Sequence, residues 1–284
     1  MEEEDEEFTV QSEIFQPGRK NSVASCGLVI SEFTFFNPQL EASNRNKKLL
    51  FDGDGDLILK RNNVSHSVVA IEHQARTTLD SVGLQVWRGA LLLCDLMLDT
   101  IRIKPHSTIL ELGSGTGVSS IIASLHAKHV VCTDININGL LDQIRRNICL
   151  NQDIIRCPIA VHELDFYTKG LGSPELRDYY SKVNVVIAAD VVYDDDLTDA
   201  FVSTLEYILS IPPRKTAYIA LEKRYVFTLT DLNTVAPCYE HFVNKITSPS
   251  CGWVCELLPM SDIRQRLQYE RLPQLVMWKI KASK

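Results

Sequence analysis

Apolar runs and amphipathic segments alternate along the chain from about residue 107 onward. Five runs are almost continuously apolar, at 107–113, 129–135, 158–166, 183–190 and 216–224. Amphipathic segments with apolar residues at helical spacing separate several of them, at 116–127, 138–152 and 197–209. Strands that are apolar on both faces are typical of a mostly parallel sheet covered by helices on both sides. The pattern therefore predicts an α/β fold.

Patterns at the two ends of this alternation extend the prediction. The stretch VWRGALLLCDLML (86–98) predicts a helix that leads into the first strand. The stretches GWVCELLPM (252–260) and QLVMWKIKA (274–282) read as strands separated by only a short segment. We expect them to form an antiparallel pair that completes the sheet.

The first 66 residues have a different character. Residues 1–25 are polar and begin with an acidic run, so we expect a disordered tail. Residues 26–66 read as a β-rich extension and linker, in which GLVISEFTFF (27–36) and KLLFDGDGDLILK (48–60) could pair as a hairpin. We place the main domain at 67–284.

Charge and cysteine usage narrow the functional classes. The net charge of −7 owes six negative charges to residues 2–7, so the rest is nearly balanced and lacks the basic field of a nucleic-acid-binding protein. Eight scattered cysteines suit reduced thiols, and Cys251 with Cys255 lacks a second pair at zinc-binding spacing. No apolar run is long enough to span a membrane. We expect a soluble monomer in the nucleus, the cytoplasm or both, without a metal ion.

A glycine-rich turn follows the first predicted strand. Gly113, Gly115 and Gly117 are spaced G-x-G-x-G, which lets the backbone approach a ligand at the start of a helix. Asp134 ends the next strand 21 residues after Gly113, where a carboxylate can hold the ribose hydroxyls of a nucleoside. These features alone suit either a nicotinamide dinucleotide or S-adenosylmethionine.

Two details weigh against the dinucleotide. The pattern G-x-G-x-x-G/A would end at Val118 or Ser120, neither of which is glycine or alanine. Glu111, two residues before the first glycine, would also repel a pyrophosphate. A carboxylate at that place suits a cofactor with a cationic ammonium and sulfonium centre.

The motifs ELGSGTG (111–117), CTDI (132–135), ELDF (163–166) and AADVVYDDD (188–196) together resemble the class I S-adenosylmethionine-dependent methyltransferases. They are most similar to the protein-lysine methyltransferases that carry a D-x-x-Y motif after the fourth strand. VWRGALLL (86–93), EKR (222–224), FTL (227–229) and YERLPQL (269–275) extend the resemblance over roughly 69–281. It implies a Rossmann-like, seven-stranded, mostly parallel sheet and a methyltransferase domain at 67–284.

The resemblance also implies the residues that contact S-adenosyl-L-methionine. They are Trp87, Glu111, Gly113, Gly115, Gly117, Asp134 at the ribose, and Asp165 with Phe166 beside the adenine. This family often has tryptophan where Phe166 stands, and phenylalanine can stack on a base but cannot donate a hydrogen bond. Trp87 could instead be an ordinary core residue, and Asp165 could be a cap at the end of a strand.

The stretch AADVVYDDDLTDAF (188–201) holds the D-x-x-Y motif and a run of acids. We expect Asp190, through its carboxylate or its neighbouring carbonyl, to orient the incoming amine, and Tyr193 to offer its aromatic face. Asp194, Asp195 and Asp196 are expected to cap and complement the following helix. Asp199 should face solvent.

The resemblance implies transfer of a methyl group to a lysine side chain of a protein, with a nuclear, nucleic-acid-associated protein as the expected substrate class. Two alternatives remain open. The chain could methylate a small molecule, although no pocket signature for one is present. It could also be an inactive module that binds the cofactor, against which the intact Glu111, Asp134 and Asp190 weigh.

Overall fold

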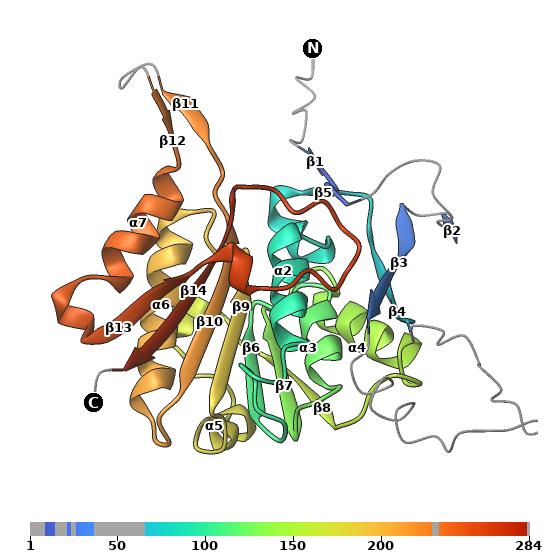
Figure 1. Ribbon diagram of the computed structural model, residues 1–284, viewed down its shortest axis with the longest axis horizontal. Coiled ribbons are helices and arrows are strands. Elements are labelled where there is room, and N and C mark those ends of the chain that lie inside the picture. The colour runs from blue at the N-terminus through green and yellow to red at the C-terminus, as the bar shows by residue number, and fades with distance from the viewer. Residues whose placement is uncertain (1–8, 15–21, 24–26, 37–65, 229–232, 283–284) are drawn as a thin grey trace, which may run out of the picture.

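The computed structural model describes residues 9–14, 22–23, 27–36, 66–228 and 233–282. Its centre is a seven-stranded sheet in the order β13-β14-β10-β9-β6-β7-β8 (Figure 1). The five strands from β10 to β8 are parallel, while β14 runs antiparallel to both β10 and β13. The strands are β6 (Thr108–Leu112), β7 (His129–Asp134), β8 (Ile159–Glu163), β9 (Val185–Ala189), β10 (Thr216–Glu222), β13 (Trp253–Leu258) and β14 (Leu275–Ala282). The predicted fold class and the final antiparallel pair are confirmed.

Helices cover both faces of this sheet (Figure 1). One face carries α2 (Arg88–Met97), α3 (Val118–Ala123) and α4 (Leu140–Leu150), and the other carries α5 (Pro174–Tyr180), α6 (Asp195–Ser210) and α7 (Pro237–Ile246). Alternate strand residues enter different cores: Val185 and Ile187 pack with α2 and α3, whereas Val186 and Ala188 pack with α5 to α7. Burial on both faces explains why the strands are continuously apolar.

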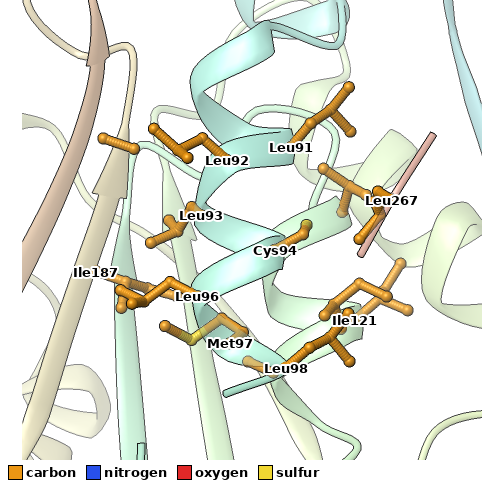
Figure 2. Close-up of a cluster of buried hydrophobic side chains, with 14 of the residues drawn as sticks. Leu91, Leu92, Leu93, Cys94, Leu96, Met97, Leu98, Ile121, Ile187 and Leu267 are labelled. Carbon is orange, nitrogen blue, oxygen red and sulfur yellow. The ribbon is translucent and has the colours of Figure 1, made fainter. Parts of the chain in front are cut away.

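Helix α2 is the centre of the first core (Figure 2). Its residues from Leu91 to Met97, and Leu98 directly after it, are at most 1% exposed, and the apolar ones share a core with Ile121 of α3 and Ile187 of β9. Leu267, from the segment between β13 and β14, belongs to the same core and lies on the side of α2 away from Ile187 (Figure 2). The run LLLCDLML, apolar except for Asp95, therefore marks a helix that is enclosed by its neighbours.

The N-terminal region adds two small sheets. Strand β3 (Leu28–Phe36) pairs with β4 (His66–Gln74) along nine residues, and β2 (Ser22–Val23) pairs with β3. Strand β1 (Thr9–Gln11) pairs with β5 (Arg76–Thr78), so part of the segment predicted to be disordered is a strand instead. The stretch 48–60, a possible hairpin partner of β3, lies outside the described residues; the partner observed for β3 is β4.

Short elements complete the chain. They are the 3-10 helices η1 (Leu79–Leu84), η2 (Phe166–Thr168), η3 (Pro249–Cys251) and η4 (Met260–Asp262), and the paired strands β11 (Val226–Thr228) and β12 (Asn233–Val235). Helix α3 is shorter than the predicted 116–127, because Gly117 still belongs to the glycine turn with a left-handed backbone. None of the helices in the described ranges is long and apolar enough to cross a bilayer.

Candidate active site at the carboxyl ends of the parallel strands

The glycine turn lies between β6 and α3. Gly113, Gly115 and Gly117 have φ angles of 68°, 54° and 81°, a left-handed region that favours glycine. A Cβ atom at Gly113 would lie 2.6 Å from Cγ1 of Val191, and one at Gly115 would lie 3.1 Å from the carbonyl oxygen of Gly83. The turn is therefore pressed between the chain after β9 and the segment before α2, and larger residues do not fit.

Glu111 lies at the floor of the site with 1% of its surface exposed. Its Oε2 atom accepts a hydrogen bond of 2.5 Å from the Ser120 hydroxyl. Burial raises the pKa of Glu111 to about 7, although the hydroxyls of Ser120, Ser119 and Ser114 oppose the shift. No ion pair between Glu111 and a basic side chain is found among the described residues, so a bound cation would lower this pKa.

Asp134 ends β7 beside the glycine turn. Its Oδ2 accepts a hydrogen bond of 2.7 Å from the Gly115 amide, and its Oδ1 accepts one of 2.8 Å from the Ile135 amide. Burial raises the pKa of Asp134 to about 6. Each carboxylate oxygen can accept a further hydrogen bond, so Asp134 can still receive hydroxyl donors.

Trp87 lies immediately before α2 and forms part of the cavity wall. Its Nε1 donates a hydrogen bond of 2.9 Å to the carbonyl of Val82, and the Arg224 guanidinium lies 4.7 Å from the centre of its ring. Trp87 is half-buried and lines the cavity, so it is not merely a core residue.

Asp165 and Phe166 lie after β8. Oδ1 of Asp165 accepts a hydrogen bond of 2.9 Å from the Tyr167 amide. Asp165 therefore caps the short helix η2, which agrees with the alternative prediction that it is a cap after the strand. It also lines the cavity, so the two readings are compatible. Phe166 is 8% exposed and packs against Phe201, and its ring faces the same cavity.

The D-x-x-Y turn follows β9. Asp190 has a left-handed φ of 52°, and both of its carboxylate oxygens accept backbone hydrogen bonds: Oδ2 from Gly89 at 2.6 Å and Oδ1 from Glu222 at 2.9 Å. The carboxylate therefore joins the start of α2 to the ends of β9 and β10. A Cβ atom on Gly89 would lie 2.4 Å from Oδ2 of Asp190, so the glycine of VWRGALLL makes room for the aspartate of D-x-x-Y.

Tyr193 stands at the mouth of the site with 48% of its surface exposed. Burial of its hydroxyl and the negative charge of Asp134 raise the pKa of Tyr193 to about 12, so the phenol is neutral at physiological pH.

The acidic run directly after Tyr193 begins helix α6. Oδ1 of Asp194 accepts a hydrogen bond of 2.8 Å from the Leu197 amide and caps α6, with Asp195 and Asp196 in the first turn. The capping interpretation of the acidic run is confirmed for Asp194.

Asp199 is half-exposed, yet it does more than face solvent. Its two oxygens accept hydrogen bonds from His241 Nε2 at 2.7 Å and Lys245 Nζ at 2.8 Å, both on α7. These contacts lower the pKa of Asp199, with the Lys245 hydrogen bond as the largest cause. The residue thus joins α6 to α7, away from the candidate site.

The site residues described above, Asp199 and the acidic run 194–196 apart, surround one cavity of about 380 Å³. All of the predicted site residues line it except Gly117, which begins α3 behind it. The wall also includes residues that the sequence did not assign to the site, among them Val10 of β1, the segment 79–86, the residues Ile137, Asn138 and Leu140 after β7, and Arg224. For the segment 79–86, the glycine at Gly83 was the sequence feature that could have indicated a close approach to the site. Strand β1, with three residues, is too short to leave a pattern.

The donor set fits S-adenosylmethionine. Glu111 offers a buried carboxylate without a basic partner in the described structure, which suits a cationic centre, and Asp134 offers acceptors to a ribose. Phe166 and Trp87 supply aromatic surface, and the volume lies within the usual range of roughly 300–1,000 Å³ for small-molecule sites. A pyrophosphate at the glycine turn would be repelled by the carboxylates of Glu111 and Asp134.

Comparison with known proteins agrees with this chemistry. A family model described as "Lysine methyltransferase" matches residues 66–246. Methyltransferase-like protein 22 is 37% identical over 235 residues in Mus musculus and 38% over 238 residues in Homo sapiens, covering 76% and 77% of this chain. The EEF1A lysine methyltransferase 3 of Xenopus tropicalis is 28% identical over 143 residues, which is 50% of this chain and 59% of that protein.

The match to the first two relatives covers only part of their length, 59% of the mouse protein and 58% of the human one. Among solved structures, magnesium protoporphyrin IX methyltransferase of Synechocystis, with bound SAH, is 14% identical at a TM-score of 0.46, covering 69% of this chain and 84% of that one. The match to the family model extends from β4 to the end of α7 and so includes the whole glycine turn and the D-x-x-Y motif. The chain belongs to the lysine methyltransferase family, with S-adenosyl-L-methionine as its cofactor.

Proposed function

We propose that this chain transfers a methyl group from S-adenosyl-L-methionine to the side-chain amine of a lysine in a protein substrate. The observation that carries the proposal is the position of the Asp190–Tyr193 turn at the mouth of the cavity whose floor holds Glu111. An aromatic ring that is half-exposed there can meet a side chain that enters from outside. Membership of the lysine methyltransferase family supports lysine as the acceptor.

The cofactor supplies an electrophilic methyl group on a sulfonium, and the residues of the chain must align an amine with it and exclude water. A lysine amine has a pKa of about 10.4 in water and attacks only in its neutral form. Desolvation in the mouth of the cavity lowers the lysine pKa, and so does the positive charge of the sulfonium. No covalent nucleophile on the protein is required.

The geometry alters the role we assign to Asp190. Its two carboxylate oxygens are each held by a backbone amide, so the carboxylate acts first on the protein, by fixing the turn to α2 and β10. The neighbouring backbone carbonyl is then the better candidate to accept a hydrogen bond from the incoming amine. Tyr193, neutral at physiological pH, does not act as a base and instead offers its ring and its hydroxyl.

The substrate is proposed as a class only. We propose a protein in the nucleus or cytoplasm, following the expectation from sequence; a nuclear, nucleic-acid-associated protein is the narrower form of this proposal. Recognition of the protein substrate must involve surface around Tyr193, because the amine reaches the site there.

Labelled cofactor added to a lysate from cells that lack the protein, together with purified chain, tests this function. We expect label in protein bands and, after acid hydrolysis, in methylated lysine. Label found only in small metabolites would favour the small-molecule alternative. Binding of the cofactor without transfer of label to any fraction would favour the inactive module.

A further inference from the structure

A short N-terminal strap, defined as residues 9–14, lies across the wall of the cavity. Its strand β1 pairs with β5 in the register Thr9↔Thr78, Val10↔Thr77 and Gln11↔Arg76. The Ser12 amide then donates a hydrogen bond of 2.9 Å to the carbonyl of Ala75. The strap is therefore attached by its backbone to the chain that leads into the site.

The strap also contributes to the cavity itself. Val10 is one of the lining residues, and its carbonyl accepts a hydrogen bond of 2.9 Å from Nε2 of Gln85, which is 1% exposed. Gln85 lies two residues before Trp87 and lines the cavity as well. The position of the strap and the position of this wall are thus set together.

Glu13 is the charged residue at the end of the strap. Its Oε2 lies 2.6 Å from Nη1 of Arg88, and its Oε1 lies 3.6 Å from Nη1 of Arg224. The side chains of Glu13 and Arg88 are 24% and 14% exposed, so their ion pair is largely shielded from solvent. Arg88 is the first residue of α2 and follows Trp87 directly.

Arg224 connects this ion pair to the ligand site. Its guanidinium covers the face of Trp87 at 4.7 Å, and both residues line the cavity. The Arg224 side chain is 42% exposed, so stacking on one face of an indole does not by itself fix it in one orientation. Glu13 is placed to hold it there, and Arg224 is also attracted by the charge of Asp190.

We propose that the strap forms a functional part of the wall of the cofactor site and that Glu13 is a positioning residue, which holds Arg224 against the Trp87 ring. The inference rests on the proposed use of this cavity for S-adenosyl-L-methionine. The match to the lysine methyltransferase family begins at residue 66, so the strap lies outside the matched region.

The test compares Glu13→Gln with Glu32→Gln in the full chain. Glu32 is exposed on β3 and does not line the cavity, so Glu32→Gln removes the same charge away from the site. Calorimetric titration with S-adenosyl-L-methionine should show affinity weakened by about fivefold for Glu13→Gln and unchanged for Glu32→Gln. Thermal melting of both variants separates this effect from a loss of folding.

A second readout needs no cofactor. Trp87 is the one of the three tryptophans that contacts Arg224, so Glu13→Gln should increase the quenching of tryptophan emission by acrylamide. In a double-mutant cycle with Arg224→Gln, the two effects on affinity should be non-additive, because they act through one contact. Wild-type affinity and wild-type quenching in Glu13→Gln, or additive effects, would overturn the inference. Failure of the wild-type chain to bind the cofactor would instead overturn the proposed function, while the quenching result would still decide the role of Glu13.

Discussion

Replacing Asp190 by asparagine should separate the fastening role of its carboxylate from any contact with substrate. Asparagine has nearly the same shape, and it tolerates the left-handed φ of 52° found here. One side-chain oxygen can still accept a hydrogen bond, but the amide nitrogen would face the N–H of either Gly89 or Glu222. One backbone donor then loses its partner.

The cost follows from these two hydrogen bonds. An unsatisfied buried donor costs about 1–3 kcal/mol. The remaining hydrogen bond also loses its charge assistance, whereas asparagine is less costly to desolvate than a carboxylate. We therefore expect a loss of about 2 kcal/mol, which lowers the melting temperature by roughly 4–8 °C in a domain of this size.

Differential scanning calorimetry and a methyl-transfer assay measure the two consequences of Asp190→Asn. We expect at least about tenfold slower transfer, because the turn that carries Tyr193 loses its attachment to α2, with cofactor affinity within a few-fold of wild type. Asp178→Asn is the matched control, since Asp178 is exposed on α5. An unchanged melting temperature together with full turnover would refute the reasoning.

Three further changes test other parts of the site and fold. Glu111 has a folded pKa of about 7, above its unfolded value, so in the absence of cofactor its contribution to stability is present below about pH 4 and is lost as the pH rises through 7. Binding of the cationic cofactor at pH 6 should release protons, and Glu111→Gln should release fewer; equal release, by calorimetry in two buffers, would contradict this. Tyr193→Phe should keep most of the methyl-transfer rate and Tyr193→Ala should lose about tenfold, with little change in cofactor affinity; full turnover by Tyr193→Ala would exclude the assigned role. Asp95 is 1% exposed and is paired with Arg271 at 2.9 Å. Its replacement by alanine should lower the free energy of unfolding by about 3–5 kcal/mol, as urea denaturation would measure. A loss below about 1 kcal/mol would show that the pair is not needed.

The sequence predicted the parts of this structure that depend on local pattern. Continuous apolar runs marked the parallel strands, and the glycine turn, Glu111 and Asp134 were expected to lie together, as they do around one cavity, because strand ends in a parallel sheet meet at one edge. The acidic run after Tyr193 was correctly interpreted as capping for Asp194, since a cap is a contact between neighbours in sequence.

Contacts between distant segments could not be predicted in the same way. Asp190 was assigned to the substrate, but its carboxylate binds amides 101 residues before it and 32 residues after it. Asp95 binds the Arg266 and Leu267 amides, the Tyr269 hydroxyl and Arg271, which explains the motif YERLPQL only once the chain is folded. No periodicity signals such pairs, because a single carboxylate has no pattern of its own.

The strap illustrates the same limit. A composition of mostly polar residues predicted disorder for the N-terminal segment, yet Thr9–Gln11 forms a strand. Three residues are too few for an alternating pattern to be recognised, and the pairing partner is more than sixty residues away. Tertiary pairing with β5 outweighs the weak local preference.

Transfer of methyl groups to lysine in proteins is tested most directly in cells. Quantitative mass spectrometry would compare methylated peptides in cells that lack the protein with cells that carry either the wild-type chain or Tyr193→Ala. We expect methyl-lysine peptides that disappear on deletion and return with the wild-type chain but not with Tyr193→Ala. A methyl-lysine profile that is the same in all of these cells would contradict it.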